Sequence, residues 1–151
     1  MELSLQPASE DDREFLYALH CRTMRHVIEK TWGWDEEWQR RDFDRRFREY
    51  LTSIIECDGR HAGGLVLEWK PESLYIHEIQ LLPDYQSKGV GTEVIGKVIE
   101  QATARRLPVT LSVVPANLRA QRLYERLGFK VTAIESPFIR MRYTGDELKL
   151  E

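Results

Sequence analysis

The sequence predicts a single α/β (α+β) domain, and three observations support this fold class. The chain has 151 residues, of which 42% are hydrophobic, which is enough for one core of ordinary size. Segments with the two-residue period of strands are interspersed with segments of helical period along the whole chain. No linker, internal repeat or low-complexity run separates them, so we expect one domain over residues 1–151.

The N-terminal part is expected to form one strand followed by two helices. Alternation of apolar and polar residues in Glu2–Gln6 predicts the strand. Ser9 and Asp12 have the spacing of a helix cap, because a side-chain oxygen can accept a hydrogen bond from a free backbone N–H group there. Apolar residues then recur at helical spacing up to Lys30. Asp35 can cap a second helix, whose outer face is expected to carry dense mixed charge.

The rest of the chain is expected to contain a hairpin, two further helices and four further strands. Asp58–Gly59 is the dipeptide that tight primed turns favour, and β-rich runs flank it. An Asn precedes the last predicted helix and a Gly ends it. After the hairpin, the expected elements are a strand over 73–82, a helix over 92–105, a strand over 109–114, a helix over 117–128 and two closing strands.

Composition argues against several classes of function. The formal net charge is −3, whereas a nucleic-acid-binding domain is usually basic, so no nucleic-acid partner is expected. No apolar run approaches the length that spans a bilayer, and the N-terminus has no export signal, so a cytoplasmic protein without a membrane partner is expected. Cys21 and Cys57 form no zinc-ligand pattern, and we expect two buried or half-buried thiols and no metal.

The segment Gln86–Gly91 has the composition of a phosphate-binding loop. A helix N-terminus has unpaired N–H groups and a partial positive charge, so it favours an anion. Gly89 and Gly91 allow close backbone approach, while Gln86 and Lys88 add a donor and a charge. The segment matches neither the Walker A loop nor the GxGxxG dinucleotide fingerprint. By itself it could also be a glycine-rich turn between a strand and a helix, which is the less favoured interpretation.

A second group of residues makes the loop more specific. In "NLRAQRLYERLGF", Asn117 lies where a strand leads into a helix, and Tyr124 follows two helical turns later. The two side chains therefore share one face of that helix. Alone, Asn117 could be a simple cap and Tyr124 a tyrosine at the edge of the core.

Together, the motifs "IQLLPDYQSKGVG" and "NLRAQRLYERLGF" resemble those of the GNAT superfamily of acetyl-CoA-dependent N-acetyltransferases, and the resemblance covers nearly the whole chain. It implies a central mixed, mostly antiparallel sheet flanked by about four helices. It also implies that acetyl-CoA binds as co-substrate: the pyrophosphate at the loop, and the pantetheine arm along the preceding strand and at Asn117. The implied contact residues are Ile79, Leu81, Leu82, Gln86, Ser87, Lys88, Gly89, Val90, Gly91, Thr92, Asn117 and Tyr124.

The resemblance implies catalytic roles less completely. Tyr124 corresponds to the family's tyrosine that protonates the leaving thiolate. A glutamate that some members use as general base corresponds here to Ser112, which cannot serve. Glu78 and His77, on the strand before the loop, are the remaining candidates, with Glu78 slightly favoured. Adjacent strand residues face opposite ways, so only one should reach the acceptor, although a bulge could change which one. A structural ion pair of Glu78 with an arginine, or an ordered water as base, stays open.

In this family the first two helices wall the acceptor site. Trp32, Trp34 and Glu29 lie in that segment, and aromatic and acidic side chains suit a cationic amine. The tryptophans could instead simply pack the helices together.

The sequence therefore predicts an N-acetyltransferase that acts on a primary amine of a small molecule, peptide or protein. The alternatives are a non-catalytic acyl-CoA-binding module or sensor and, less favoured, a partner-binding scaffold that uses the tryptophan-rich surface. A homodimer through the C-terminal strands is possible.

Overall fold

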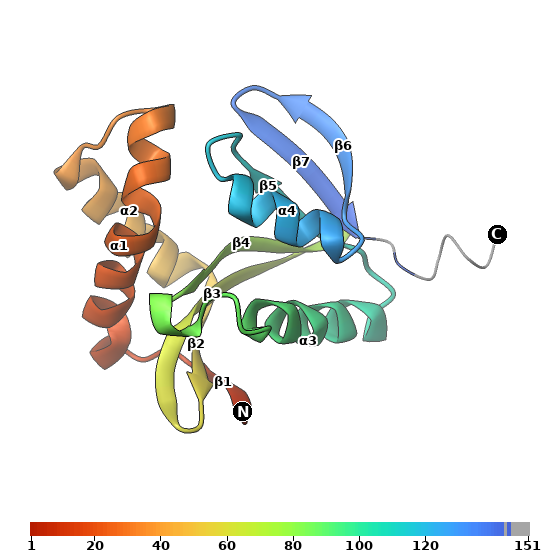
Figure 1. Ribbon diagram of the computed structural model, residues 1–151, viewed down its shortest axis with the longest axis horizontal. Coiled ribbons are helices and arrows are strands. Elements are labelled where there is room, and N and C mark those ends of the chain that lie inside the picture. Colours follow the sequence, from red (N-terminus) through yellow and green to blue (C-terminus); the bar gives the residue numbers. More distant parts are fainter. Residues whose placement is uncertain (144, 146–151) are drawn as a thin grey trace.

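The computed structural model describes residues 1–143 and 145 and shows a mixed sheet of seven strands flanked by four α-helices (Figure 1). This confirms the fold class predicted from the sequence. In chain order the elements are β1 (Leu3–Pro7), a 3-10 turn (Glu10–Asp12), α1 (Arg13–Thr31), α2 (Glu36–Glu49), β2 (Leu51–Cys57), β3 (Arg60–Lys70), β4 (Ser73–Leu81), a 3-10 turn (Pro83–Tyr85), α3 (Val90–Ala104), β5 (Val109–Val113), α4 (Leu118–Arg126), β6 (Lys130–Glu135) and β7 (Phe138–Tyr143).

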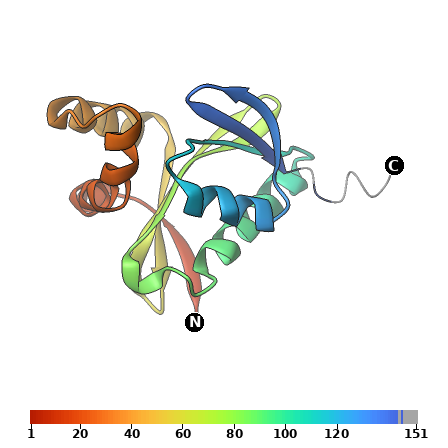
Figure 2. The same ribbon diagram turned by 45° about the horizontal axis from the view of Figure 1, so that its top comes forward.

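The sheet has the strand order β1-β2-β3-β4-β5-β7-β6. Every pair of neighbours is antiparallel except β4 and β5, which run parallel. These two strands pair only from Leu74 to Ile76 on β4 and from Val109 to Leu111 on β5. The register ends at Ile76, and Figures 1 and 2 show β4 and β5 separating from each other. The second half of β4 therefore has no strand partner on that side.

Helices cover both faces of the sheet. Ile54 and Ile55 are adjacent on β2 and point to opposite faces. Ile54 packs with Leu16 of α1 and Phe43 of α2. Ile55 belongs to the larger core cluster, which contains the inward face of α3 and Tyr124 of α4. The sheet is thus held between α1 and α2 on one face and α3 on the other (Figure 1).

Local signals placed several turns and helix ends correctly. The Asp35 side chain accepts a hydrogen bond from the backbone N–H of Trp38 at 3.0 Å and so caps α2. Asp58 and Gly59 both have positive φ, as a primed hairpin turn requires. Gly128 follows α4 with φ 101°. Helix α3 begins at Val90, two residues before the predicted start.

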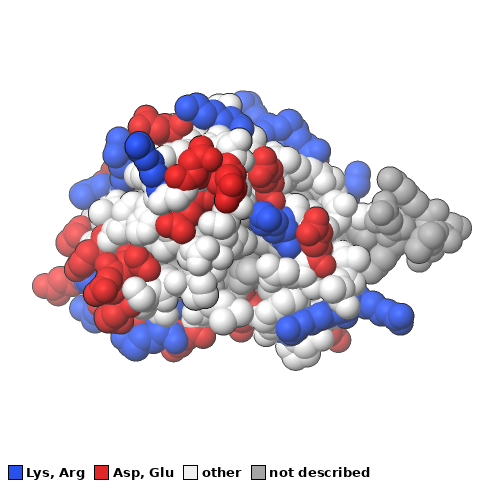
Figure 3. All heavy atoms as spheres, turned by 90° about the horizontal axis from the view of Figure 1, so that it is seen from below, with Lys and Arg blue, Asp and Glu red and all other residues white. Residues whose placement is uncertain are grey.

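The two cysteines are free thiols, Cys57 buried and Cys21 half-buried, as predicted. Within residues 1–143 and 145, no helix is both long and apolar enough to cross a membrane, and no group of three or more metal-ligating side chains occurs. Acidic and basic side chains are interspersed over the face shown in Figure 3.

Candidate functional site

Two cavities of similar size, about 700 Å³ and 670 Å³, lie next to each other along the free half of β4. We name them the acceptor cavity and the cofactor groove. The acceptor cavity is bounded by α1, α2, β4, β5, α4 and β7, and the cofactor groove by α1, β4, α4 and the loop before α3. Their common wall consists of Met24, Ile79, Gln80, Asn117, Ala120 and Tyr124. The two cavities therefore meet where β4 and β5 separate.

The cofactor groove ends at the start of α3, where Gly89 is the N-cap residue with φ 82°. Only glycine adopts this left-handed conformation without strain. A Cβ atom at Gly89 would meet no protein atom within 4 Å, so the space beside it is open to a ligand. The first N–H groups of α3 have no partner within the helix and favour an anion. The loop thus fits a pyrophosphate chemically.

Arg119, at the start of α4, also contributes to this loop, and the sequence analysis missed it. Its guanidinium donates hydrogen bonds to Gln86 Oε1 at 2.6 Å and to Ser87 Oγ at 2.7 Å. Gln86 in turn donates to the carbonyl oxygen of Leu81 at 2.9 Å. Arg119, Arg122 and Arg126 recur at helical spacing and all line the groove. This spacing was the signal that could have revealed a basic wall for phosphates.

The residues expected to bind the cofactor divide into two sets. The wall of the groove contains Ile79, Leu81, Gln86, Ser87, Gly89, Gly91, Thr92, Asn117 and Tyr124. Three others, Leu82, Lys88 and Val90, are not part of it. Val90 is buried in the core, and the backbone N–H of Leu82 donates to Ala62 at 2.8 Å. Lys88 is exposed and lies between the wall residues Ser87 and Gly89.

The acceptor cavity has largely aromatic and aliphatic walls. Trp32 and Trp38 line it while remaining 57% and 52% exposed. The ring centroid of Trp32 lies 5.8 Å from that of Phe138 on β7, so these two side chains meet across the cavity. Trp38 and Phe138 were not singled out in the sequence. Their place in the cavity wall depends on tertiary contacts, which the local sequence does not reveal.

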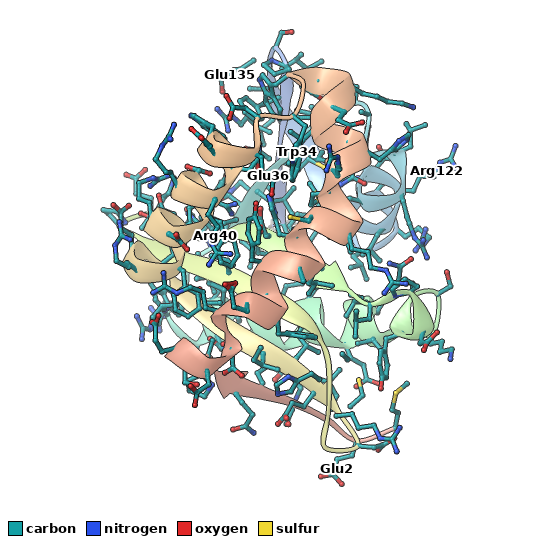
Figure 4. The ribbon with its side chains drawn as sticks, turned by 90° about the vertical axis from the view of Figure 1, so that its left-hand side faces the viewer. Glu2, Trp34, Glu36, Arg40, Arg122 and Glu135 are labelled. Carbon is teal, nitrogen blue, oxygen red and sulfur yellow. The ribbon has the colours of Figure 1, made fainter. Side chains whose placement is uncertain are left out.

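The structure places Trp34 and Glu29, two of the expected acceptor contacts, outside the walls of this cavity. Trp34 Nε1 donates a hydrogen bond to Glu36 Oε2 at 2.6 Å, and Figure 4 shows the two side chains side by side between α1 and α2. Glu29 pairs with Arg25 at 2.7 Å on the surface of α1. Trp34 therefore helps to hold α1 and α2 together.

A buried charge cluster forms the floor of the acceptor cavity. Arg46 of α2 contacts Glu78 Oε1 at 2.8 Å and Asp42 Oδ2 at 3.0 Å. His20 Nδ1 lies 3.6 Å from Glu78 Oε1, and His20 Nε2 lies 3.0 Å from Gln39 Oε1. The sequence analysis did not single out Asp42 or Arg46 among the many charged residues of α2, whose outer face carries exposed ion pairs as expected. Asp42 and Arg46 both lie one turn or less from Phe43, which turns that side of the helix toward the sheet.

The cluster shifts the pKa values of its members. Burial alone would raise the pKa of Glu78, but the positive charge of Arg46 and the proximity of His20 outweigh it and lower the pKa to about 2. Burial would lower the pKa of His20, yet the nearby Glu78 carboxylate outweighs burial and raises it. Glu78 is therefore an ionised, paired carboxylate at neutral pH, which matches the ion-pair alternative from the sequence.

His77 also lines the acceptor cavity, so the expectation that only one of His77 and Glu78 would reach it was wrong. Val66 of β3 pairs with Glu78 and Leu67 pairs with Ile76, which leaves His77 as the extra residue of a β-bulge. His77 Nε2 lies 2.8 Å from Glu68 Oε1, and its ring stacks on Tyr50 at 3.9 Å. Burial is the main cause of its lowered pKa, so the ring is neutral at neutral pH.

Tyr124 lies in the wall common to both cavities, one helical turn from Ala120 and two from Asn117. Asn117 Oδ1 accepts a hydrogen bond from the backbone N–H of Ala120 at 3.3 Å and caps α4. Burial and, next, the negative charge of Glu78 raise the pKa of Tyr124. Its hydroxyl is therefore protonated at neutral pH and can donate a hydrogen bond or a proton.

Two proteins with similar sequences are named as N-acetyltransferases. The chain is 30% identical to an uncharacterized N-acetyltransferase of Methanocaldococcus jannaschii, over 91% of this chain and 65% of the relative. It is 26% identical to the thialysine N-epsilon-acetyltransferase of Mus musculus, over 68% of this chain and 67% of the relative. The chain thus spans about two thirds of the length of these curated relatives.

Solved structures share the fold. The PaiA N-acetyltransferase of Thermoplasma acidophilum, solved with coenzyme A, matches with a TM-score of 0.72 and 17% identity, over 94% of this chain and 98% of that one. A GNAT family acetyltransferase of Elizabethkingia anophelis, solved with acetyl-CoA, matches with a TM-score of 0.66 and 16% identity, over 93% and 96%. The sequence model of the acetyltransferase (GNAT) family matches residues 13–129. The chain therefore belongs to the acetyltransferase (GNAT) family.

Proposed function

We propose that the protein is an acetyl-CoA-dependent N-acetyltransferase that acetylates a primary amine by direct attack. The observation that carries this proposal is the meeting of the two cavities at Ile79, Asn117 and Tyr124. A groove with a phosphate-type loop at its far end and a second cavity at its near end can hold two substrates. Their reacting atoms would then be adjacent, which removes much of the entropic cost of the reaction.

The free half of β4 supports the proposed position of the cofactor arm. Because β4 and β5 pair only up to Ile76, backbone groups from His77 to Leu81 lack a strand partner on that side. Such groups can bind an extended amide-containing chain like an added strand. Acetyl-CoA would supply the acetyl group as a thioester. An N–H group of this strand can also stabilise negative charge that develops on the carbonyl oxygen.

Proton transfers can be assigned to residues of the common wall and the acceptor cavity. An alkylamine with a pKa of about 10 is mostly protonated at neutral pH, so it must lose a proton before or during attack. The neutral ring of His77 is the better candidate for taking that proton, because Glu78, with a pKa of about 2, is a weak base. Glu78 would instead attract the cationic amine. The Tyr124 hydroxyl would donate a proton to the departing thiolate.

The test separates chemistry from binding at Tyr124. Tyr124→Phe removes only the hydroxyl, and general acid catalysis contributes about 10²–10⁴-fold. We expect thiol release from acetyl-CoA to fall by at least about 10²-fold, with acetyl-CoA affinity unchanged. Tyr143→Phe is the matched control, since Tyr143 packs beside Phe129 and lines neither cavity.

Equal turnover in Tyr124→Phe would remove Tyr124 from the acid role. Acetyl-CoA binding without thiol release, for every amine offered to the unaltered protein, would instead favour the non-catalytic binding module.

A further inference from the structure

The acceptor cavity combines a bulky apolar space with a charge arrangement that restricts what can bind. Its aliphatic walls include Val27 and Ile28 of α1 and Val113 and Val114 from the end of β5. Trp32 and Phe138, whose ring centroids are 5.8 Å apart, add two aromatic rings to the wall. Burial of an aliphatic or aromatic group among such walls is favourable, whereas a charge placed there loses its hydration without compensation.

The positively charged side chains in the walls of the acceptor cavity are paired with carboxylates. Arg46 is the only wall residue among those described that is cationic at every ordinary pH, and both of its carboxylate partners, Asp42 and Glu78, belong to the same wall. The two histidines of the wall, His20 and His77, face Glu78 and Glu68 in turn. A carboxylate entering this cavity would therefore meet paired cations and additional negative charge.

A cationic amine finds a more favourable environment. Asp35 lines the cavity, and one of its oxygens accepts the capping hydrogen bond from Trp38. The exposed indoles of Trp32 and Trp38 can make cation–π contacts with an ammonium group as it enters. Glu78 lies deeper, beside the common wall with the cofactor groove.

We propose that the acceptor is a primary amine on an apolar, ring-sized body that carries no carboxylate. This inference rests on the function proposed above and narrows its substrate class. It separates the protein from its relatives named as thialysine acetyltransferases, because thialysine is an amino acid with a carboxylate.

The experiment uses two amines that differ in one group. 4-Methylphenethylamine and 4-(2-aminoethyl)benzoate have the same reacting amine, and the second replaces a methyl group by a carboxylate. Their binding to the protein in the presence of CoA is followed by calorimetry, and their acetylation by thiol release from acetyl-CoA. We expect the methyl compound to bind at least about tenfold more tightly, because the carboxylate is desolvated without a free cation. Thialysine should also bind at least about tenfold more weakly.

Substitutions in the cavity wall test whether the amine binds there. Phe138→Ala should weaken binding of 4-methylphenethylamine by roughly five- to tenfold, the loss expected for one aromatic contact. Trp32→Ala, at a 57% exposed position, should act in the same direction without risk to folding. Ile134→Ala is the matched control, because Ile134 lies on the same hairpin, is 75% exposed and is not a wall residue.

The outcomes separate this inference from the proposed function. Equal or tighter binding of the benzoate or thialysine, or no binding of the methyl compound, would overturn the inference. Tight binding of the methyl compound without thiol release would support the ligand class and refute the acetyltransferase function.

Discussion

The ionised carboxylate of Glu78 is expected to stabilise the fold. Its side chain is 17% exposed and contacts Arg46 at 2.8 Å. The pKa falls from its ordinary value of 4.5 to about 2. At 1.36 kcal/mol per pKa unit, this difference corresponds to about 3 kcal/mol of stabilisation by the ionised form. We therefore expect Glu78→Gln to lower the free energy of unfolding at pH 7 by about 3 kcal/mol, within the range for breaking a buried ion pair.

The sign of the pH dependence follows from the direction of the shift. Because the folded-state pKa is depressed, the stabilisation is present above the unfolded value of 4.5 and is lost as pH falls toward 2. At pH 3 about 1.4 kcal/mol should remain. His20 also gains a charge beside Glu78 below its ordinary pKa of 6.5, so the difference between wild type and Glu78→Gln is compared at lower pH and should shrink between pH 5 and pH 3.

Urea unfolding curves at several pH values measure this difference. Glu135→Gln is the control, because Glu135 is 63% exposed and pairs with Arg140 on the surface, where an ion pair contributes less than about 1 kcal/mol. A stability difference for Glu78→Gln that does not change with pH would show that the ionised carboxylate does not stabilise the fold. So would a difference no larger than that of the control.

Two further predictions concern the groove and the base. Arg119→Ala should weaken CoA binding by about tenfold or more, and the loss should be smaller at high salt. The control Arg105→Ala, outside the groove, should leave CoA affinity unchanged. Equal CoA affinities of the two variants would exclude the Arg119 contact. If His77 takes the amine proton, the pH profile of kcat/KM should show a decrease as the pH drops through a value below 6.5. His77→Asn should abolish this decrease. A decrease centred above pH 6.5 would indicate His20 instead.

Much of the fold could be predicted because its signals are local. The cap at Asp35 and the turn at Asp58–Gly59 depend on residues within a few positions of each other. The loop around Gly89 is similar, since a glycine before an apolar helix needs no distant partner to be recognised.

The acceptor cavity could be predicted only in part, because its residues come from six elements. Arg46 stands in a run of charges that is typical of an exposed helix face, and only its position three residues after Phe43 indicates the buried side. His20 follows Leu16 by one turn, which is the same kind of signal. The bulge at His77 depends on pairing with β3, which the sequence of β4 does not contain.

In the proposed function, the loop from Gln86 to Gly91 holds the pyrophosphate of CoA. The most direct test is calorimetric titration of the protein with acetyl-CoA, beside Gly89→Glu and Gly59→Glu. Both glycines have positive φ and open space beside them, so the two substitutions strain the backbone alike, but only Gly89 borders the groove. We predict binding to the wild type and to Gly59→Glu, and none to Gly89→Glu. Equal affinity of all three proteins for acetyl-CoA would contradict the account.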